Sequence, residues 1–159
     1  MRRFLKFLHT MGSLGYAGAL AALLVMMSRL PAPSALDGYA LIRGTMSAVA
    51  TWLLFPSVAL VLLAGLVSMA VTRAYHNAGW VWLKLLTGVL VFEGTFVGVL
   101  GPMQVEAEQS AAALAGRVDR ATLGASLGAE QGTLWLLLAV ATANVVLGIW
   151  RPRLTRIPD

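Results

Sequence analysis

The chain has 159 residues, of which 58% are hydrophobic and only 12% are charged, and its mean hydropathy is +0.78. Soluble domains carry roughly 25% charged residues, so a soluble fold of this size would expose apolar surface with no polar residues to cover it. This composition excludes an ordinary cytosolic or secreted domain, a disordered chain and a nucleic-acid binder, despite the net charge of +5. Because the chain has zero cysteines, disulfides, thiolate metal sites, iron–sulfur clusters and cysteine nucleophiles are excluded too.

Charged residues divide the chain into four apolar stretches, at about 4–28, 44–72, 80–101 and 132–150. Each can cross a hydrocarbon layer of about 30 Å, and a backbone inside a membrane must satisfy its own hydrogen bonds, so helices are expected. Pro56 inside the second stretch predicts a bent or tilted helix. We therefore predict an all-α fold: an integral membrane four-helix bundle that forms a single transmembrane domain over residues 1–159.

The connections between these stretches differ in kind. Residues 31–40 form a turn-rich loop, and residues 72–79 form a tight turn on the opposite side of the membrane. Residues 103–130 are alanine-rich and mildly amphipathic. This segment predicts a helical outer loop between the third and fourth spans, with one or two surface helices.

Basic residues predict the orientation in the membrane. The expected cytoplasmic side holds Arg2, Arg3, Lys6, Arg73, Lys84, Arg151, Arg153 and Arg156. The other side holds four arginines balanced by acidic residues: Arg29, Arg43, Arg117 and Arg120, with Asp37, Glu106, Glu108, Asp119 and Glu130. The positive-inside rule then places both termini in the cytoplasm, and this asymmetry accounts for the net charge without a nucleic-acid partner. The first apolar run is longer than the core of a signal peptide, so we expect a retained helix.

Two histidines, His9 and His76, fall near the predicted cytoplasmic side. Neutral imidazole is the usual protein ligand of haem iron, and four-helix bundles hold such cofactors between facing helices. His9 shares a helix face with Gly12, which would leave room for a flat macrocycle, and with Tyr16, which could hydrogen-bond within the bundle. The alternatives are that His9 packs near the headgroups and bonds a backbone carbonyl, and that His76 is solvated.

Three further polar residues fall within the apolar stretches. Lys84 either extends towards the headgroups or pairs with a carboxylate such as a haem propionate. Glu93 falls near the middle of the bilayer, where an ionised carboxylate is costly, so proton handling or cofactor contact competes with a role in holding helices together. Nine residues separate it from Lys84, which places the two on roughly opposite helix faces. We expect Glu93 and Asn144 to be buried polar residues, and Asn144 could bond Glu93 or Thr95 across the bundle.

Small residues form two candidate packing surfaces. Gly94 and Gly98 make a GxxxG pattern in the third span, and Gly15 with Ala19 makes a small stripe on the first. Such surfaces permit close helix contact, either within one chain or between subunits. Besides the lipid bilayer, the expected partners are therefore other membrane-protein subunits or a second copy of the chain.

Short motifs in all four spans resemble those of small four-helix bacterial membrane proteins. LKFLHTMGSLGYAGAL, with His9 and Tyr16, is similar to the first helix of a group that includes the membrane-type protoporphyrinogen oxidase, the copper-resistance D domain and a membrane family of unknown function. Similar matches continue in FPSVALVLLAGL, in GWVWLKLL with Lys84, and in FVGVLGPMQ. The resemblance implies a bacterial inner-membrane protein with haem b or a porphyrin near His9 and Lys84. Trp82 stands where the oxidase has a histidine, which counts against that activity.

Three functions follow from these features. The leading hypothesis is that the protein binds haem b or a porphyrin, with His9 as the iron ligand, for electron transfer or tetrapyrrole metabolism. The alternative is a non-enzymatic accessory subunit of a larger membrane complex, or a homo-oligomer. A small proton-coupled transporter that uses Glu93 is the third. Whether the protein is an enzyme stays open, and no P-loop, dinucleotide fingerprint, HExxH or serine elbow occurs in the sequence.

Overall fold

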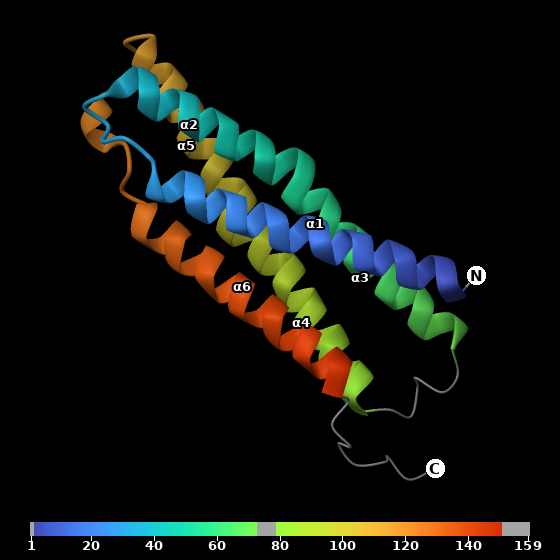
Figure 1. Cartoon of the computed structure of the whole chain (residues 1–159). Helices are drawn as coiled ribbons and strands as arrows, with labels where there is room; N and C mark the ends of the chain where they lie inside the picture. The colour runs from blue at the N-terminus through green and yellow to red at the C-terminus, as the bar shows by residue number, and fades with distance from the viewer. Residues whose placement is uncertain (1, 73–78, 151–159) are drawn as a thin grey trace.

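The computed structural model describes residues 2–72 and 79–150, and this part of the chain is all-helical. The elements in chain order are α1 (Arg2–Ser28), α2 (Leu36–Val49), η1 (Ala50–Leu54), α3 (Phe55–Val71), α4 (Gly79–Thr95), η3 (Phe96–Leu100), α5 (Gly101–Leu114), η4 (Arg120–Thr122) and α6 (Leu127–Trp150). Figure 1 shows that α2 runs directly into α3, and α4 into α5, so that each pair forms one long rod.

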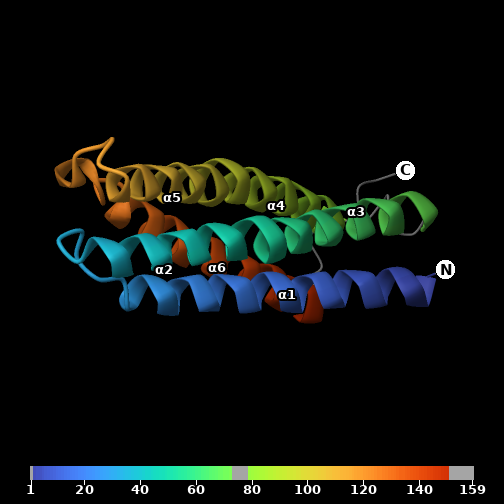
Figure 2. The ribbon, with the colours of Figure 1, turned by 90° about the horizontal axis from the view of Figure 1, so that it is seen from above.

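In the described part of the chain, four helices are long and apolar enough to cross a membrane: Arg3–Ser28, Leu36–Val71, Gly79–Leu114 and Arg120–Trp150. They form one antiparallel bundle, in which α1 and α4 each pack against both α3 and α6, while α2 packs against α5 (Figure 2). The prediction of an all-α bundle with four membrane-spanning helices is confirmed at this level. The orientation with both termini in the cytoplasm stays a prediction.

The two long rods, α2 with α3 and α4 with α5, are longer than the apolar spans predicted from the positions of charged residues. The helix that was expected to begin near residue 44 begins at Leu36, and the one expected to end near residue 101 continues to Leu114. Within the segment expected to form a helical outer loop, 103–130, the helix continues from α4 through η3 and α5 to Leu114, and the non-helical connection begins after it. Polar side chains end the apolar stretch at Gln104, but they do not end backbone hydrogen bonding, which continues into the alanine-rich segment.

Each long rod is interrupted by a π-helical segment that ends just before a proline. The N–H of Phe55 bonds the carbonyl of Ala50, and the N–H of Gly101 bonds that of Phe96. Pro56 and Pro102 then lie in the first turn of α3 and of α5. A proline removes an N–H and its ring clashes with the carbonyl four residues earlier, and a wider turn relieves that clash. The disturbance expected at Pro56 thus takes the form of a π-helical segment.

The two long rods match each other in reverse order. In one, α2 has 14 residues and α3 has 17, and in the other α4 has 17 and α5 has 14. Because the rods are antiparallel, η1 and η3 lie at the same level of the bundle and contact each other. The proline-linked discontinuities are therefore packed against one another inside the protein.

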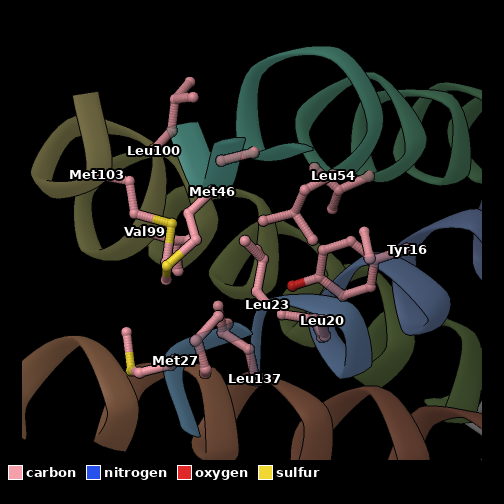
Figure 3. Packing of buried hydrophobic residues seen from close by; sticks show 14 of the residues in the cluster. Tyr16, Leu20, Leu23, Met27, Met46, Leu54, Val99, Leu100, Met103 and Leu137 are labelled. Carbon is pink, nitrogen blue, oxygen red and sulfur yellow. The ribbon is translucent and has the colours of Figure 1, made fainter. Parts of the chain in front are cut away.

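The core is a continuous apolar cluster built from α1, from α6 and from the two long rods (Figure 3). Its fully buried members include Leu20, Leu23, Met46, Leu54, Val99, Met103 and Leu134. Large apolar side chains also cover the outside of the bundle, where Trp52 is 80% exposed and Leu41 is 71% exposed. An apolar outer surface this extensive is typical of a protein whose surroundings are lipid.

Both small-residue surfaces lie against helices of the same chain. A Cβ atom added at Gly98 would lie 2.8 Å from Cγ2 of Thr133 in α6, and one added at Gly15 would lie 2.6 Å from Oγ of Ser57 in α3. Ala19 is fully buried in the core. The close approach predicted for these residues therefore occurs within the monomer, and contact with a partner would need another face.

Gly12 gives the sharpest test of the α1–α3 contact. A Cβ atom there would lie 2.9 Å from Cγ2 of Val61 and 3.0 Å from the backbone oxygen of Ser57, whereas one at Gly18 would meet nothing within 4 Å. We expect Gly12→Leu to lower the free energy of unfolding by about 1–3 kcal/mol, because the backbone of α3 must move away. Gly18→Leu is the control and should leave stability nearly unchanged. Denaturant titration in detergent measures both, and equal stability of the two variants would contradict the contact.

Candidate functional site

Polar side chains gather at two levels inside the bundle. One group lies where α1 and α4 begin and α6 ends, which we name the His9 end (Figure 1). The other lies where α1 ends and α2 and α6 begin, which we name the Arg43 end. The sequence analysis singled out His9, Lys84 and Asn144 of the first group, but it gave the charged residues of the second only as charges on the outer side of the membrane.

His9 lies on α1, half-buried against α3. Its Nδ1 donates a hydrogen bond to the backbone oxygen of Val61 over 3.0 Å, because a carbonyl can only accept. Gly65, one turn further along α3, lies beside the ring, since a Cβ there would be in ordinary van der Waals contact, 3.9 Å from Cε1 of His9. The carbonyl contact weighed from sequence is therefore present. It places the proton on Nδ1 and leaves the lone pair on Nε2, which makes no hydrogen bond within residues 2–72 and 79–150.

The space beside Gly12 is filled by α3, through Val61 and Ser57. The expectation that this glycine leaves room for a macrocycle is therefore wrong, because two helices approach there closely enough for backbone contact. Any ligand of His9 must approach from the Nε2 side of the ring.

Tyr16, two turns after His9, is buried in the core and 4% exposed. Its hydroxyl lies 2.8 Å from Oγ1 of Thr95 on α4. Because the Thr95 hydroxyl donates to the backbone oxygen of Val91 over 2.7 Å, the Tyr16 hydroxyl is the donor between the two. Tyr16 therefore links α1 to α4 in the middle of the bundle. This is the kind of hydrogen bond within the bundle that the sequence suggested for Tyr16.

Lys84 and Asn144 lie where α4 meets α6. A Cβ atom at Gly148 would lie 3.0 Å from Nζ of Lys84, so the ammonium group rests against the backbone of α6, within electrostatic range of His9. The Thr87 hydroxyl donates to Oδ1 of Asn144 over 2.7 Å. The side chain of Asn144 thus bonds neither Glu93 nor Thr95. It lies nearer the His9 end, where a different turn of α4 faces it.

Glu93 is exposed on the outside of α4, so the expectation of a buried side chain is wrong. The phase of the helix decides this, because Thr95 points into the core and Gly94 packs against Leu137 of α6. Lys84 and Glu93 do lie on different faces, as their spacing predicts. His76 lies outside the described residues.

A second group, the Arg43 cluster, consists of Tyr39, Arg43, Glu106, Ser126 and Glu130. Nη1 of Arg43 donates to Oε2 of Glu130 over 2.6 Å, and Nε lies 3.2 Å from the Tyr39 hydroxyl. That hydroxyl donates to Oε1 of Glu106 over 2.6 Å. The Ser126 hydroxyl donates to the second oxygen of Glu130. The cluster connects α2, α5 and α6.

The Arg43 cluster is almost completely shielded. Arg43 and Tyr39 are 0% exposed, Glu130 is 2% and Glu106 is 5%. Two carboxylates face a single guanidinium, and the backbone N–H of Gly124 supplies one more donor to Glu106 over 2.7 Å. Nη2 of Arg43 is buried 4.0 Å from Oε1 of Glu106 without a hydrogen bond in the described chain. The bonding is extensive enough to hold three helices and a loop in one arrangement.

The sequence does indicate that Arg43 is buried, but the assignment of charged residues to the two sides of the membrane did not use that pattern. Tyr39 and Arg43 continue the helical spacing of the buried residues Met46, Ala50 and Leu54. An arginine in phase with an apolar stripe indicates a buried cation. Its acidic partners could not be named in advance, since Glu130 lies 87 residues away in the sequence.

Neither polar group forms a ready-made metal centre. Among the described residues, no set of three or more His, Asp or Glu side chains could hold a metal ion. Among the described residues at the His9 end, His9 supplies the one imidazole, and the carboxylates of the Arg43 cluster are already bound by donors. With these described residues alone, a metal bound through His9 would have to bring its other ligands with it, as the iron of a porphyrin does.

Comparison of the chain with protein-family models, with curated proteins and with solved structures found no match. The resemblance noted in the short apolar motifs thus stays a prediction.

The Arg43 cluster predicts a large loss of stability when its cation is removed. Arg43→Met should lower the free energy of unfolding by about 3–5 kcal/mol, because two buried carboxylates lose their counter-charge. Arg117→Met is the matched control, since Arg117 is exposed, and it should change stability by less than about 0.5 kcal/mol. Unfolding titrations in detergent compare the two, and a small effect of Arg43→Met would show that the cluster does not hold the helices together.

Proposed function

We propose that this multi-pass membrane protein binds haem b or a related porphyrin with Nε2 of His9 as an axial ligand, and serves electron transfer or tetrapyrrole metabolism. The observation that carries the proposal is the hydrogen bond from Nδ1 of His9 to the Val61 carbonyl. Histidines that bind metals commonly donate their other ring N–H to a carbonyl or carboxylate, which fixes the tautomer and the ring orientation. The His9 imidazole has this arrangement within a helix bundle.

Lys84 supports the proposal from the neighbouring helix. Its ammonium group lies against Gly148 of α6, on a side chain that is partly buried, and within electrostatic range of His9. A bound haem b would supply one-electron redox chemistry, and its propionates need a positive partner at the edge of the membrane. In this proposal His9 holds the iron, Lys84 neutralises a propionate, and Tyr16 keeps α1 and α4 in register through Thr95.

The proposed location is the bacterial inner membrane, with the His9 end facing the cytoplasm. Lys6 and Lys84 lie at that end, and the positive-inside rule places such residues in the cytoplasm. Trp82 and Trp150 also lie there and are 49% and 72% exposed, as expected of tryptophans at the interface between membrane and water.

A second candidate function is that of a non-enzymatic subunit of a larger membrane complex or of a homo-oligomer. It is favoured by Glu93, a carboxyl group that faces outward from an apolar part of α4. The two candidates are not exclusive, because the proposed haem ligand lies on α1 and the outward carboxyl group lies on α4.

The visible spectrum of the purified protein tests the haem proposal. With haem supplied during expression, we expect a Soret band and a sharp α-band after reduction with dithionite. His9→Ala should abolish both, while Thr10→Ala, a change at an exposed neighbour, should retain them. His76→Ala would show whether a second imidazole binds the iron. A colourless wild-type protein would refute the proposal and favour the second candidate.

Lys84→Gln separates propionate binding from iron ligation. If the ammonium group neutralises a propionate, its loss should weaken haem binding about tenfold, since a hydrogen bond to a charged group contributes about 1.5–3 kcal/mol. The Soret position should stay unchanged because His9 is intact. Haem transfer to apomyoglobin measures the affinity, with Lys6→Gln as the control at an exposed lysine. Equal retention in both variants would remove Lys84 from the site.

A further inference from the structure

Glu93 points directly away from the core of the bundle. The residue before it, Phe92, packs its ring against Phe55 of α3, with 5.5 Å between the centroids. The residue after it, Gly94, packs against Leu137 of α6. Glu93 therefore lies on the side of α4 that neither α3 nor α6 covers. In the described part of the chain its side chain is exposed and makes no hydrogen bond or ion pair.

The depth of Glu93 makes this exposure costly. In the rod formed by α4 and α5, the apolar stretch lies between Lys84 and Gln104. At about 1.5 Å of rise per residue that stretch matches a hydrocarbon layer of about 30 Å, and Glu93 falls near its centre. Ionisable residues in membrane spans almost always face a bundle interior, a cavity or a partner. Within residues 2–72 and 79–150, Glu93 faces neither the interior of the bundle nor a polar side chain to which it bonds.

The residues around Glu93 form a stripe along α4 and into η3. Leu86, Val89, Glu93 and Phe96 follow one another at intervals of three, four and three residues, which is the spacing of a coiled-coil seam. Leu86 is 59% exposed, Val89 is 46% and Phe96 is 51%. A helix that packs along this seam would cover the carboxyl group together with its apolar neighbours. One polar residue within such a seam specifies register and the number of helices.

A second copy of the chain carries the same seam and the same carboxyl group. Two copies inserted in the same orientation place Glu93 at the same depth, so a two-fold axis along the membrane normal brings the two carboxyl groups together. A protonated carboxyl group is both a donor and an acceptor, and is therefore complementary to itself. Polar side chains that hydrogen-bond across helices are a recognised source of association in membranes.

We propose that two copies of this chain form a parallel dimer along Leu86, Val89 and Glu93 of α4 and Phe96 of η3, with the two Glu93 carboxyl groups hydrogen-bonded in the middle of the membrane. The interface leaves the contacts of Gly94 and Gly98 with α6 in place. It gives the second candidate function a defined surface and does not depend on haem binding at His9.

Cysteine crosslinking in native membranes tests the geometry. The chain has zero cysteines, so a single Val89→Cys lies close to its counterpart across the proposed axis and should form a disulfide-linked dimer on mild oxidation. Leu136→Cys is the matched control, because Leu136 is exposed on α6, away from the seam, and should stay monomeric. A product of another size from Val89→Cys, or equal crosslinking of both variants, would overturn the proposal.

The role of the carboxyl group is tested by energy transfer between two labelled populations in liposomes, diluted over a range of lipid ratios. Glu93→Gln should dimerise like the wild type, since a carboxamide also bonds its counterpart. Glu93→Leu should raise the dissociation constant about tenfold, as expected for the loss of a hydrogen bond between helices. Leu136→Ala controls for a change on the lipid-facing surface, and His9→Ala should dimerise normally. A wild type that is monomeric at every ratio, or a Glu93→Leu variant as tight as the wild type, would overturn the proposal.

Discussion

The guanidinium of Arg43 holds α2, α5 and α6 together at one end of the bundle. It lies fully buried between α2, α5 and α6, bonded to Glu130 and Tyr39 and facing Glu106. In lipid, apolar contact alone provides little preference between one helix arrangement and another, because hydrocarbon tails satisfy a leucine as well as a neighbouring helix does. A buried cation with two carboxylates has far fewer acceptable arrangements. The Arg43 cluster therefore fixes which helices are neighbours at its end of the bundle.

From that end, the rest of the bundle follows by close packing. The two long rods run antiparallel with their π-helical segments at one level, and Pro56 and Pro102 occupy equivalent places in them. At the His9 end the helices are held by small residues and single hydrogen bonds, such as Gly12 against Val61 and Thr87 to Asn144. The two ends thus differ in the interactions that hold them. The Arg43 end is held by buried ion pairs and hydrogen bonds, and the His9 end is held by close packing beside an imidazole with a fixed orientation.

This difference explains why the proposed functions lie away from the Arg43 cluster. Its carboxylates already accept hydrogen bonds from buried donors, so they have little capacity left for a ligand. In the described part of the chain, Nε2 of His9 and both carboxyl oxygens of Glu93 make no hydrogen bond. In the two proposals, the first binds the iron of a porphyrin and the second bonds an identical group in another subunit. A cofactor site on α1 and a subunit interface on α4 are therefore compatible in one molecule.

The sequence by itself determined the four apolar helices, since a backbone in hydrocarbon must bond to itself, and it placed Lys84 and Glu93 on different faces of one helix. It also indicated that His9 could bond a carbonyl. Only the tertiary structure decided that Glu93 faces outward, that Asn144 meets Thr87, and that Arg43 meets Glu130. The physical reason is that local geometry fixes the angles between residues along a helix, whereas the rotation of that helix about its axis depends on which neighbours pack against it.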